Sequence, residues 1–198
     1  YAKMLKVIDK IIKKSNHKFE YVDLGGGMGI SYEKNNKKLN FKIYNSLINN
    51  FLKKNKCKII FEPGRSLIAN TGILISKVIY IKKNKNKTFI ILDAGMNDLM
   101  RPALYGAKHQ IIPSKKNKKK INGIFEFVGP ICESTDTFLT TKKFQKIKED
   151  DFVIICDVGA YGMSLTSNYN VRPLPAEVLI KGSKIQIIKK RQKLIDIT

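Results

Sequence analysis

Two short segments near the start of the chain have the residue types that bind anions. They are Gly25-Gly26-Gly27, after the apolar run 19–24, and Glu62-Pro63-Gly64-Arg65, after the apolar run 57–61. Consecutive glycines let backbone amides form a concave nest near a phosphate, and an arginine binds phosphate or carboxylate with two parallel hydrogen bonds. A plain tight turn is the alternative for the glycine run, because the G-x-G-x-x-G spacing of dinucleotide folds is absent. Since both segments follow predicted strands, we expect them to form one shared site.

The arginines are informative because this chain carries almost all of its positive charge on lysine. The only arginines are Arg65, Arg101, Arg172 and Arg191. A planar guanidinium recognises carboxylate and phosphate groups in a way that an ammonium does not. Arg101 shares the polar segment 97–105 with Tyr105, so the sequence predicts an anion-binding role there. A structural pair between an arginine and an aspartate is the alternative.

A thiol, two carboxylates and a phenol follow later predicted strands. Cys132, Glu133 and Asp136 come after a Gly-Pro turn, and Tyr161 lies in a Gly-Ala-Tyr-Gly sequence. A free cysteine beside a glutamate could act as a proton donor, although most free cysteines are small buried hydrophobes. Glycines around Tyr161 would let its phenol reach into a site, and a core tyrosine is the alternative reading.

Hydrophobic periodicity divides the chain into two parts that would position these side chains. Residues 1–70 alternate helix and strand, with helices expected over 1–15 and 41–52 and strands over 19–24 and 57–61. Residues 71–198 predict a mainly antiparallel β-domain, with strands over 72–81, 88–92, 109–112, 121–128, 152–156, 176–180 and 185–188. The predicted fold class is therefore α/β followed by all-β.

Composition argues against a nucleic-acid-binding protein, a disulfide-stabilised or metal-binding protein, and a membrane-spanning protein. The 198 residues are 43% hydrophobic and 27% charged, which is typical of a globular chain. The formal net charge of +22 suggests a nucleic-acid partner, but the lysine runs at 82–87 and 115–120 lack interleaved aromatic residues, so we expect none. Three cysteines without metal-ligand spacing predict neither a disulfide framework nor a metal site, and they fit a reducing cytoplasm. No apolar run is long enough to span a membrane.

The order of these motifs resembles the carboxyl-terminal half of the diaminopimelate decarboxylase family over nearly the whole chain. The segments that carry the resemblance are Gly25–Gly27, Glu62–Arg65, Met100–Tyr105, Gly129–Ser134 and Gly159–Gly162. That family belongs to the pyridoxal-phosphate enzymes of the alanine-racemase type, in which a (β/α)8 barrel is joined to a β-domain. The resemblance implies that residues 1–70 are the last βα units of a partial barrel and that residues 71–198 are the β-domain. It also implies a cytoplasmic lyase of lysine biosynthesis, a homodimer whose subunits share the active site, that converts meso-2,6-diaminopimelate into L-lysine and CO2.

The resemblance further implies a role for each motif. Pyridoxal 5'-phosphate would be held by Gly25, Gly26, Gly27, Glu62, Pro63, Gly64, Arg65 and Tyr161. The amino-acid substrate would be bound by Arg65, Arg101, Tyr105, Glu133 and Tyr161. Cys132 would donate a proton in the active site of the neighbouring subunit. The substrate carries an amino acid at each end, so its distal end needs a cation for the carboxylate and an anion for the ammonium, roles that suit Arg101 and Glu133.

The family's Schiff-base lysine and its cofactor-stacking histidine lie in the amino-terminal half of the barrel, upstream of the region that this chain resembles. We therefore expect the 198-residue chain to be inactive alone, with an incomplete barrel whose strand edges are exposed. His17 and His109 lie outside the motifs and receive no role. Two alternatives stay open: a decarboxylase of another basic amino acid, ornithine or arginine, and a non-catalytic remnant that pairs with a partner chain.

Overall fold

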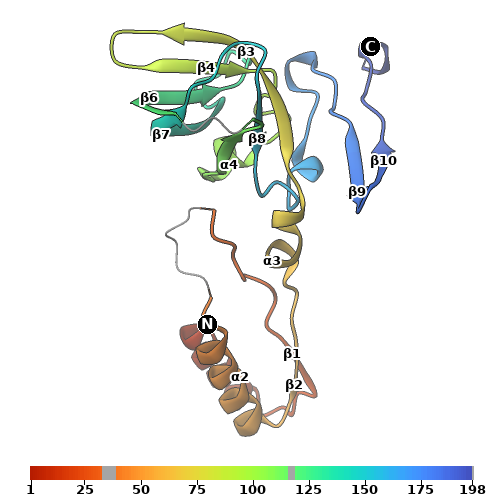
Figure 1. Ribbon diagram of the computed structural model, residues 1–198. Coiled ribbons are helices and arrows are strands. Elements are labelled where there is room, and N and C mark those ends of the chain that lie inside the picture. The colour runs from red at the N-terminus through yellow and green to blue at the C-terminus, as the bar shows by residue number, and fades with distance from the viewer. Residues whose placement is uncertain (33–38, 116–118, 198) are drawn as a thin grey trace. The chain divides into compact units, whose positions relative to one another are not determined.

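The protein, for which we describe a computed structural model, folds into two compact units. The structure describes residues 1–32, 39–115 and 119–197, so the lysine run 115–120 lies partly outside the described residues. Unit 1 is Tyr1–Leu67 and unit 2 is Ile68–Thr198 (Figure 1). Within the described ranges, no helix is long and apolar enough to cross a membrane.

Unit 1 combines two long helices with a pair of short strands. Its elements are α1 (Ala2–Ser15), β1 (Tyr21–Asp23), α2 (Phe41–Asn55) and β2 (Lys58–Ile60), and the short α3 (Gly64–Ile68) begins at its end. The side chain of Asn40 starts α2, because its Oδ1 accepts hydrogen bonds from the amides of Lys42 and Ile43 at 3.1 Å each. Both long helices end at a left-handed residue, Asn16 or Lys56.

The two strands of unit 1 are parallel, with Val22 opposite Ile59. Helix α2 places Tyr44, Ile48 and Phe51 on one face at helical spacing, and these side chains are buried with those of Leu5 and Leu24. Because β1 and β2 run in the same direction, the segments that follow them leave the sheet at the same edge. The fold of unit 1 therefore brings the two predicted anion-binding segments side by side.

Unit 2 is built on a six-stranded sheet. Its strands are β3 (Leu74–Lys83), β4 (Thr88–Leu92), β5 (Ile111–Pro113), β6 (Lys120–Val128), β7 (Thr137–Gln145) and β8 (Phe152–Ile155), in the spatial order β5-β8-β3-β4-β6-β7. All neighbours in this sheet are antiparallel except β4 and β6, which are parallel. A separate hairpin is formed by β9 (Glu177–Lys181) and β10 (Lys184–Lys189). Short helical segments complete the unit: η1 (Ala69–Thr71), α4 (Arg101–Tyr105), η2 (Met163–Leu165), η3 (Tyr169–Val171) and η4 (Leu194–Asp196).

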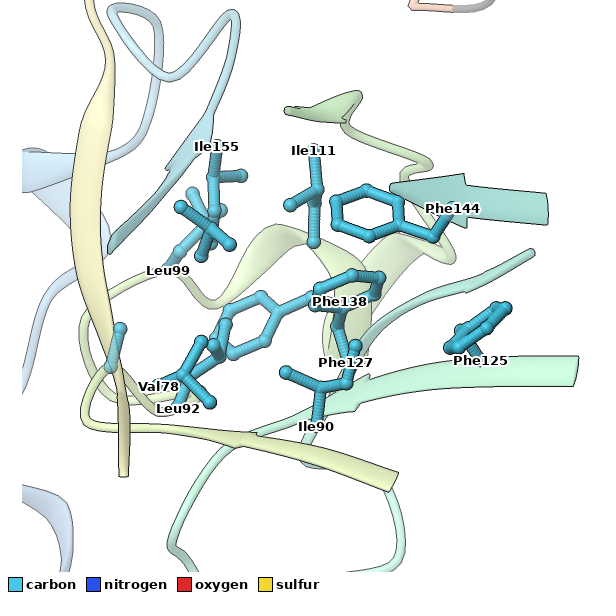
Figure 2. Close-up of a cluster of buried hydrophobic side chains, with 12 residues drawn as sticks. Val78, Ile90, Leu92, Leu99, Ile111, Phe125, Phe127, Phe138, Phe144 and Ile155 are labelled. Atoms are coloured by element: carbon cyan, nitrogen blue, oxygen red, sulfur yellow. The ribbon is translucent and has the colours of Figure 1, made fainter. Parts of the chain in front are cut away.

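The core of unit 2 gathers side chains from all six strands of the sheet, as Figure 2 shows. Val78, Ile90 and Phe127 are fully buried in it, and the rings of Phe127 and Phe144 meet edge to face with centroids 4.7 Å apart. Each buried aromatic ring removes a large apolar area from water, which is the main favourable contribution to folding. This core fixes the strands whose ends carry the predicted site residues of unit 2.

The prediction of a mainly antiparallel β-domain is confirmed, with one strand missed. Residues 137–145 form β7, which pairs with β6, although the sequence prediction left them unassigned. Thr140, Thr141, Lys142 and Lys143 interrupt the apolar pattern there, and only Phe138 and Phe144 are buried. Pairing with β6 therefore stabilises β7 where hydrophobic alternation is too weak to reveal it. The short helix α4 was also not predicted.

Candidate functional site

The glycine loop after β1 is tied to the segment after β2 by backbone hydrogen bonds. The amide of Leu24 donates to the Ile60 carbonyl at 3.0 Å, and the amide of Glu62 donates to the Gly25 carbonyl at 2.9 Å. Asp23 adds a side-chain contact, because its Oδ1 accepts from the Gly25 amide at 2.7 Å. The two segments therefore lie next to each other, and the shared site that the sequence predicts for them stays a prediction.

Glycine is required at several points of this loop. Gly25 and Gly27 have φ angles of +63° and +75°, a region that side-chain-bearing residues rarely adopt. At Gly26 a Cβ atom would overlap the backbone carbonyl oxygen of Glu62. The Nη2 atom of Arg65 lies 3.6 Å from the position that a Cβ on Gly29 would take, so the guanidinium stands against the glycine loop. Unit 1 thus combines close-packed glycine backbone with an adjacent positive charge.

In unit 2 an arginine lies against two aromatic rings. Arg101 begins α4 and is only 6% exposed. Its guanidinium carbon lies 5.6 Å from the ring centroid of Tyr105 and 5.1 Å from that of Tyr161, a cation–π arrangement. Both tyrosines are largely exposed. The structure therefore brings together three of the five predicted substrate-binding residues. Of the other two, Arg65 belongs to unit 1 and Glu133 lies on a separate loop of unit 2.

A close crossing of two backbone segments holds the loop of Tyr161 in place. The amide of Val158 donates to the Gly72 carbonyl at 3.0 Å, and the amide of Gly159 donates to the Ala69 carbonyl at 2.9 Å. A Cβ on Gly159 would overlap the carbonyl oxygen of Ile68. Tyr161 itself has a φ of +62°, a conformation that residues other than glycine rarely adopt and that the surrounding contacts of this loop hold.

The loop that carries Cys132 and Glu133 is organised by Asp136. The Asp136 carboxylate is buried and accepts hydrogen bonds from the amide of Met96 at 2.7 Å and the amide of Ile131 at 2.8 Å. Burial raises the pKa of Asp136, and these two amide hydrogen bonds oppose that rise. Asp136, one of the two carboxylates that the sequence singled out here, therefore shapes the loop, whereas Cys132 and Glu133 are exposed on it.

Glu133 has a partner that the sequence prediction did not include. The hydroxyl of Tyr169, in η3, donates a hydrogen bond to Oε1 of Glu133 at 2.5 Å. This hydrogen bond raises the pKa of Tyr169 and so favours its protonated, donating form. The two residues are 36 positions apart in the sequence, so no local pattern could have linked them.

Arg172, for which the sequence predicts no role, has a structural one. Its Nε donates to Oδ1 of Asn97 at 3.1 Å, Nη2 donates to the carbonyl of Asp93, and Nη2 lies 3.8 Å from Oδ2 of Asp98. Burial raises the pKa of Asp98, which the Gly95 amide and the charge of Arg172 oppose. Arg172 thus fixes the segment that leads into α4, the helix that begins at Arg101.

His109, which received no role from the sequence, is fully buried next to this region. Its Nδ1 lies 2.9 Å from the carbonyl oxygen of Cys156. Burial lowers the pKa of His109 below its usual value of 6.5, and the positive charge of Arg101 lowers it further, while the Cys156 carbonyl opposes the shift. His109 is therefore a neutral structural residue near physiological pH.

The stability of the protein should consequently fall as the pH drops below about 6.5. In that range the unfolded chain binds a proton at His109 and the folded chain does not, so acid favours the unfolded state. We expect His109→Asn, which can still donate to the Cys156 carbonyl, to flatten the pH dependence of the thermal midpoint between pH 7 and 5. The exposed His17 supplies the control, and an equal flattening in His17→Asn would contradict this assignment.

Comparison with known proteins gives this arrangement a family. The model of the pyridoxal-dependent decarboxylase C-terminal sheet domain matches residues 5–159. The diaminopimelate decarboxylase of Zymomonas mobilis is 43% identical over 187 residues, which are 94% of this chain and 44% of the relative. That of Aquifex aeolicus is 41% identical over 174 residues, which are 87% of this chain and 41% of the relative.

A solved structure agrees with these sequence relatives. The diaminopimelate decarboxylase of Helicobacter pylori in complex with L-lysine matches with a TM-score of 0.85 and 41% identity, covering 99% of this chain and 48% of that one. The chain therefore spans about half the length of the relatives that it matches. The family model matches residues 5–159, which are more than half of the chain. The chain therefore belongs to the pyridoxal-dependent decarboxylase family, in the region of its carboxyl-terminal sheet domain.

Proposed function

We propose that this chain is the carboxyl-terminal half of a pyridoxal 5'-phosphate-dependent decarboxylase that converts meso-2,6-diaminopimelate into L-lysine and CO2. Both curated relatives are named diaminopimelate decarboxylases, and the Helicobacter pylori structure contains L-lysine, the product of that reaction. Unit 1, in which parallel strands alternate with helices, would be the last βα units of a (β/α)8 barrel. Unit 2 would be the β-domain that completes the enzyme.

The observation that carries the choice of substrate is that unit 2 offers both charges that the distal end of the substrate requires, a cation at Arg101 and an anion at Glu133. Arg101 lies against two aromatic rings, and Glu133 is an exposed carboxylate hydrogen-bonded to Tyr169. The distal end of meso-2,6-diaminopimelate carries both a carboxylate and an ammonium. Arg101 would bind the carboxylate and Glu133 the ammonium, whereas ornithine has no distal carboxylate for Arg101 to recognise.

The edge of unit 1 has the features that a cofactor phosphate requires. The closely packed backbone at Gly26 and the left-handed Gly25 and Gly27 permit close approach of an anion, and the Arg65 guanidinium stands beside them. These residues, with the turn 62–64, would hold the phosphate and ring of pyridoxal 5'-phosphate. When bound, the cofactor supplies a conjugated ring that accepts the electron pair released as CO2 leaves.

The remaining residues of this chain would orient the substrate and supply a proton. Arg101, Tyr105 and Tyr161, which lie together in unit 2, would hold the amino acid so that its scissile bond is aligned. Cys132 is exposed with a free thiol, and it would donate the proton that replaces CO2 on the α-carbon. In a homodimer with a shared active site, that thiol and the adjacent Glu133 carboxylate would both come from the neighbouring subunit. The three free cysteines fit a reducing cytoplasm.

We expect Glu133→Gln to lower kcat/KM for meso-2,6-diaminopimelate about 30-fold, mainly through KM. The glutamine keeps the shape and loses the charge that binds the ammonium, and a charge-assisted hydrogen bond contributes about 2 kcal/mol. The measurement is steady-state kinetics on the assembled enzyme, by which we mean this chain preceded by an amino-terminal half such as that of the Helicobacter pylori relative.

The matched control is Glu20→Gln, because Glu20 is an exposed carboxylate paired with Lys58 at 3.2 Å and has no part in the proposed site. That variant should keep the kinetics of the parent. A Glu133→Gln enzyme with kcat/KM within twofold of the parent would remove Glu133 from substrate recognition.

A further inference from the structure

We propose that Tyr169 is a positioning residue, which holds the Glu133 carboxylate in the orientation that receives the distal ammonium of the substrate. This inference rests on the proposed function and adds to it a residue outside the predicted motifs. It is carried by the hydrogen bond that Tyr169 donates to Oε1 of Glu133 at 2.5 Å.

The hydrogen bond matters because Glu133 is exposed. A solvent-exposed glutamate side chain samples several rotamers, and a substrate that binds it must first restrict them. A donor fixed on Oε1 selects one orientation in advance and directs Oε2 to a defined position. Such preorganisation improves substrate binding without adding a direct contact to the substrate.

The backbone around Tyr169 is held in an unusual conformation. Asn170 and Val171, the two residues that follow Tyr169, have φ angles of +56° and +54°. Asparagine tolerates this region, but a β-branched residue such as valine very rarely adopts it. Strained backbone of this kind persists only where surrounding contacts impose it, and it occurs preferentially at functional sites.

The contacts that impose this conformation lie on both sides of Tyr169. On one side, the amide of Ser167 donates to the carbonyl of Asn97 at 3.0 Å. Asn168 donates through Nδ2 to the carbonyl of Arg172 at 2.8 Å and to Oε1 of Gln192 at 2.6 Å. On the other side, Arg172 donates through Nε to Oδ1 of Asn97 at 3.1 Å. The segment 167–172 is thus closed into a fixed loop.

The acceptor side of the pair is equally well fixed. Glu133 belongs to the loop that Asp136 ties to the amides of Ile131 and Met96, and the amide of Glu133 itself donates to the Ile131 carbonyl at 2.8 Å. Met96 immediately precedes Asn97, the residue that holds the Tyr169 loop. Both loops are therefore anchored on the same short segment, so the phenol and the carboxylate keep a constant separation.

The test is Tyr169→Phe in the assembled enzyme, which removes the hydroxyl and keeps the ring. We expect KM for meso-2,6-diaminopimelate to rise about five- to tenfold, with kcat and the thermal midpoint close to those of the parent. The effect should disappear in the Glu133→Gln background, because the hydroxyl would act only through the carboxylate. Tyr80→Phe is the control, since Tyr80 is an exposed tyrosine of β3 outside the site.

The possible results separate this inference from the proposed function. If the assembled enzyme and its Glu133→Gln variant behave as expected but Tyr169→Phe keeps the parent's KM within twofold, the positioning role is wrong and the proposed function stands. An equal loss from Tyr169→Phe in both the parent and the Glu133→Gln background would show a merely structural role and also overturn the inference. Absence of any turnover of meso-2,6-diaminopimelate would overturn both proposals.

Discussion

Replacing Asp136 by alanine should lower the free energy of unfolding of unit 2 by about 3 kcal/mol. The substitution leaves the amides of Met96 and Ile131 without the buried carboxylate that accepts their hydrogen bonds at 2.7 and 2.8 Å. Each buried donor left without an acceptor costs roughly 1–3 kcal/mol. For a chain of this size we expect a drop in the thermal midpoint of about 6–12 °C, measured by circular dichroism.

The isosteric variants Asp136→Asn and Asp150→Asn make a matched pair. At position 136 the amide group can accept from one backbone N–H and must face the other with its own donor, so an intermediate loss is expected. Asp150 is exposed and pairs with Lys77 at 2.6 Å on the surface, and its replacement should leave the midpoint unchanged. Equal midpoints for the parent and Asp136→Ala would mean that this carboxylate does not hold the loop of Cys132 and Glu133.

Replacing Gly26 by alanine should weaken the binding of pyridoxal 5'-phosphate to the assembled enzyme about 100-fold. The new Cβ would overlap the carbonyl oxygen of Glu62, so the glycine loop and the turn that begins there have to separate. Groups that bind a ligand have to stay within about 0.5 Å of their productive positions, so displaced amides would hold the phosphate poorly. Titration of the apoenzyme with the cofactor, followed by its absorbance, measures the change.

Gly29→Ala provides the comparison for the fold of this loop. A Cβ at Gly29 would lie 3.6 Å from Nη2 of Arg65, which is an ordinary contact distance. The thermal midpoint of the Gly29→Ala variant should therefore match that of the parent. An affinity of Gly26→Ala within threefold of the parent would argue that the glycine loop does not bind the cofactor.

Much of the fold follows from local sequence patterns. The apolar faces of α1 and α2 and the two short strands of unit 1 are visible as periodicity, and most strands of unit 2 appear as apolar runs between polar loops. The exception, β7, depends on pairing with β6, because its threonines and lysines hide the alternation. The parallel pairing of β4 with β6 inside an otherwise antiparallel sheet was likewise set by tertiary packing.

The candidate site likewise contains some residues that the sequence reveals and others that only the structure reveals. Motif residues such as Gly26, Arg65 and Arg101 could be singled out because their types suit anion binding and because they stand in motifs with a recognisable order. Tyr169 and the two partners of Asp136 could not, because their contacts join residues far apart in sequence or use backbone amides, which have no residue-specific signal. Sequence reasoning therefore proposes residues whose types suit ligand contact, whereas the residues that hold them in place become visible only in the structure.

The most direct test of this account is a substrate panel on the assembled enzyme, with meso-2,6-diaminopimelate, L-ornithine and L-arginine supplied separately in the presence of pyridoxal 5'-phosphate. We predict release of CO2 and formation of L-lysine from meso-2,6-diaminopimelate, with a kcat/KM at least 100-fold above that for either other amino acid. Neither ornithine nor arginine has a distal carboxylate to pair with the buried Arg101. Faster turnover of ornithine or arginine, or no turnover of any of the three by an enzyme that binds the cofactor, would contradict the account.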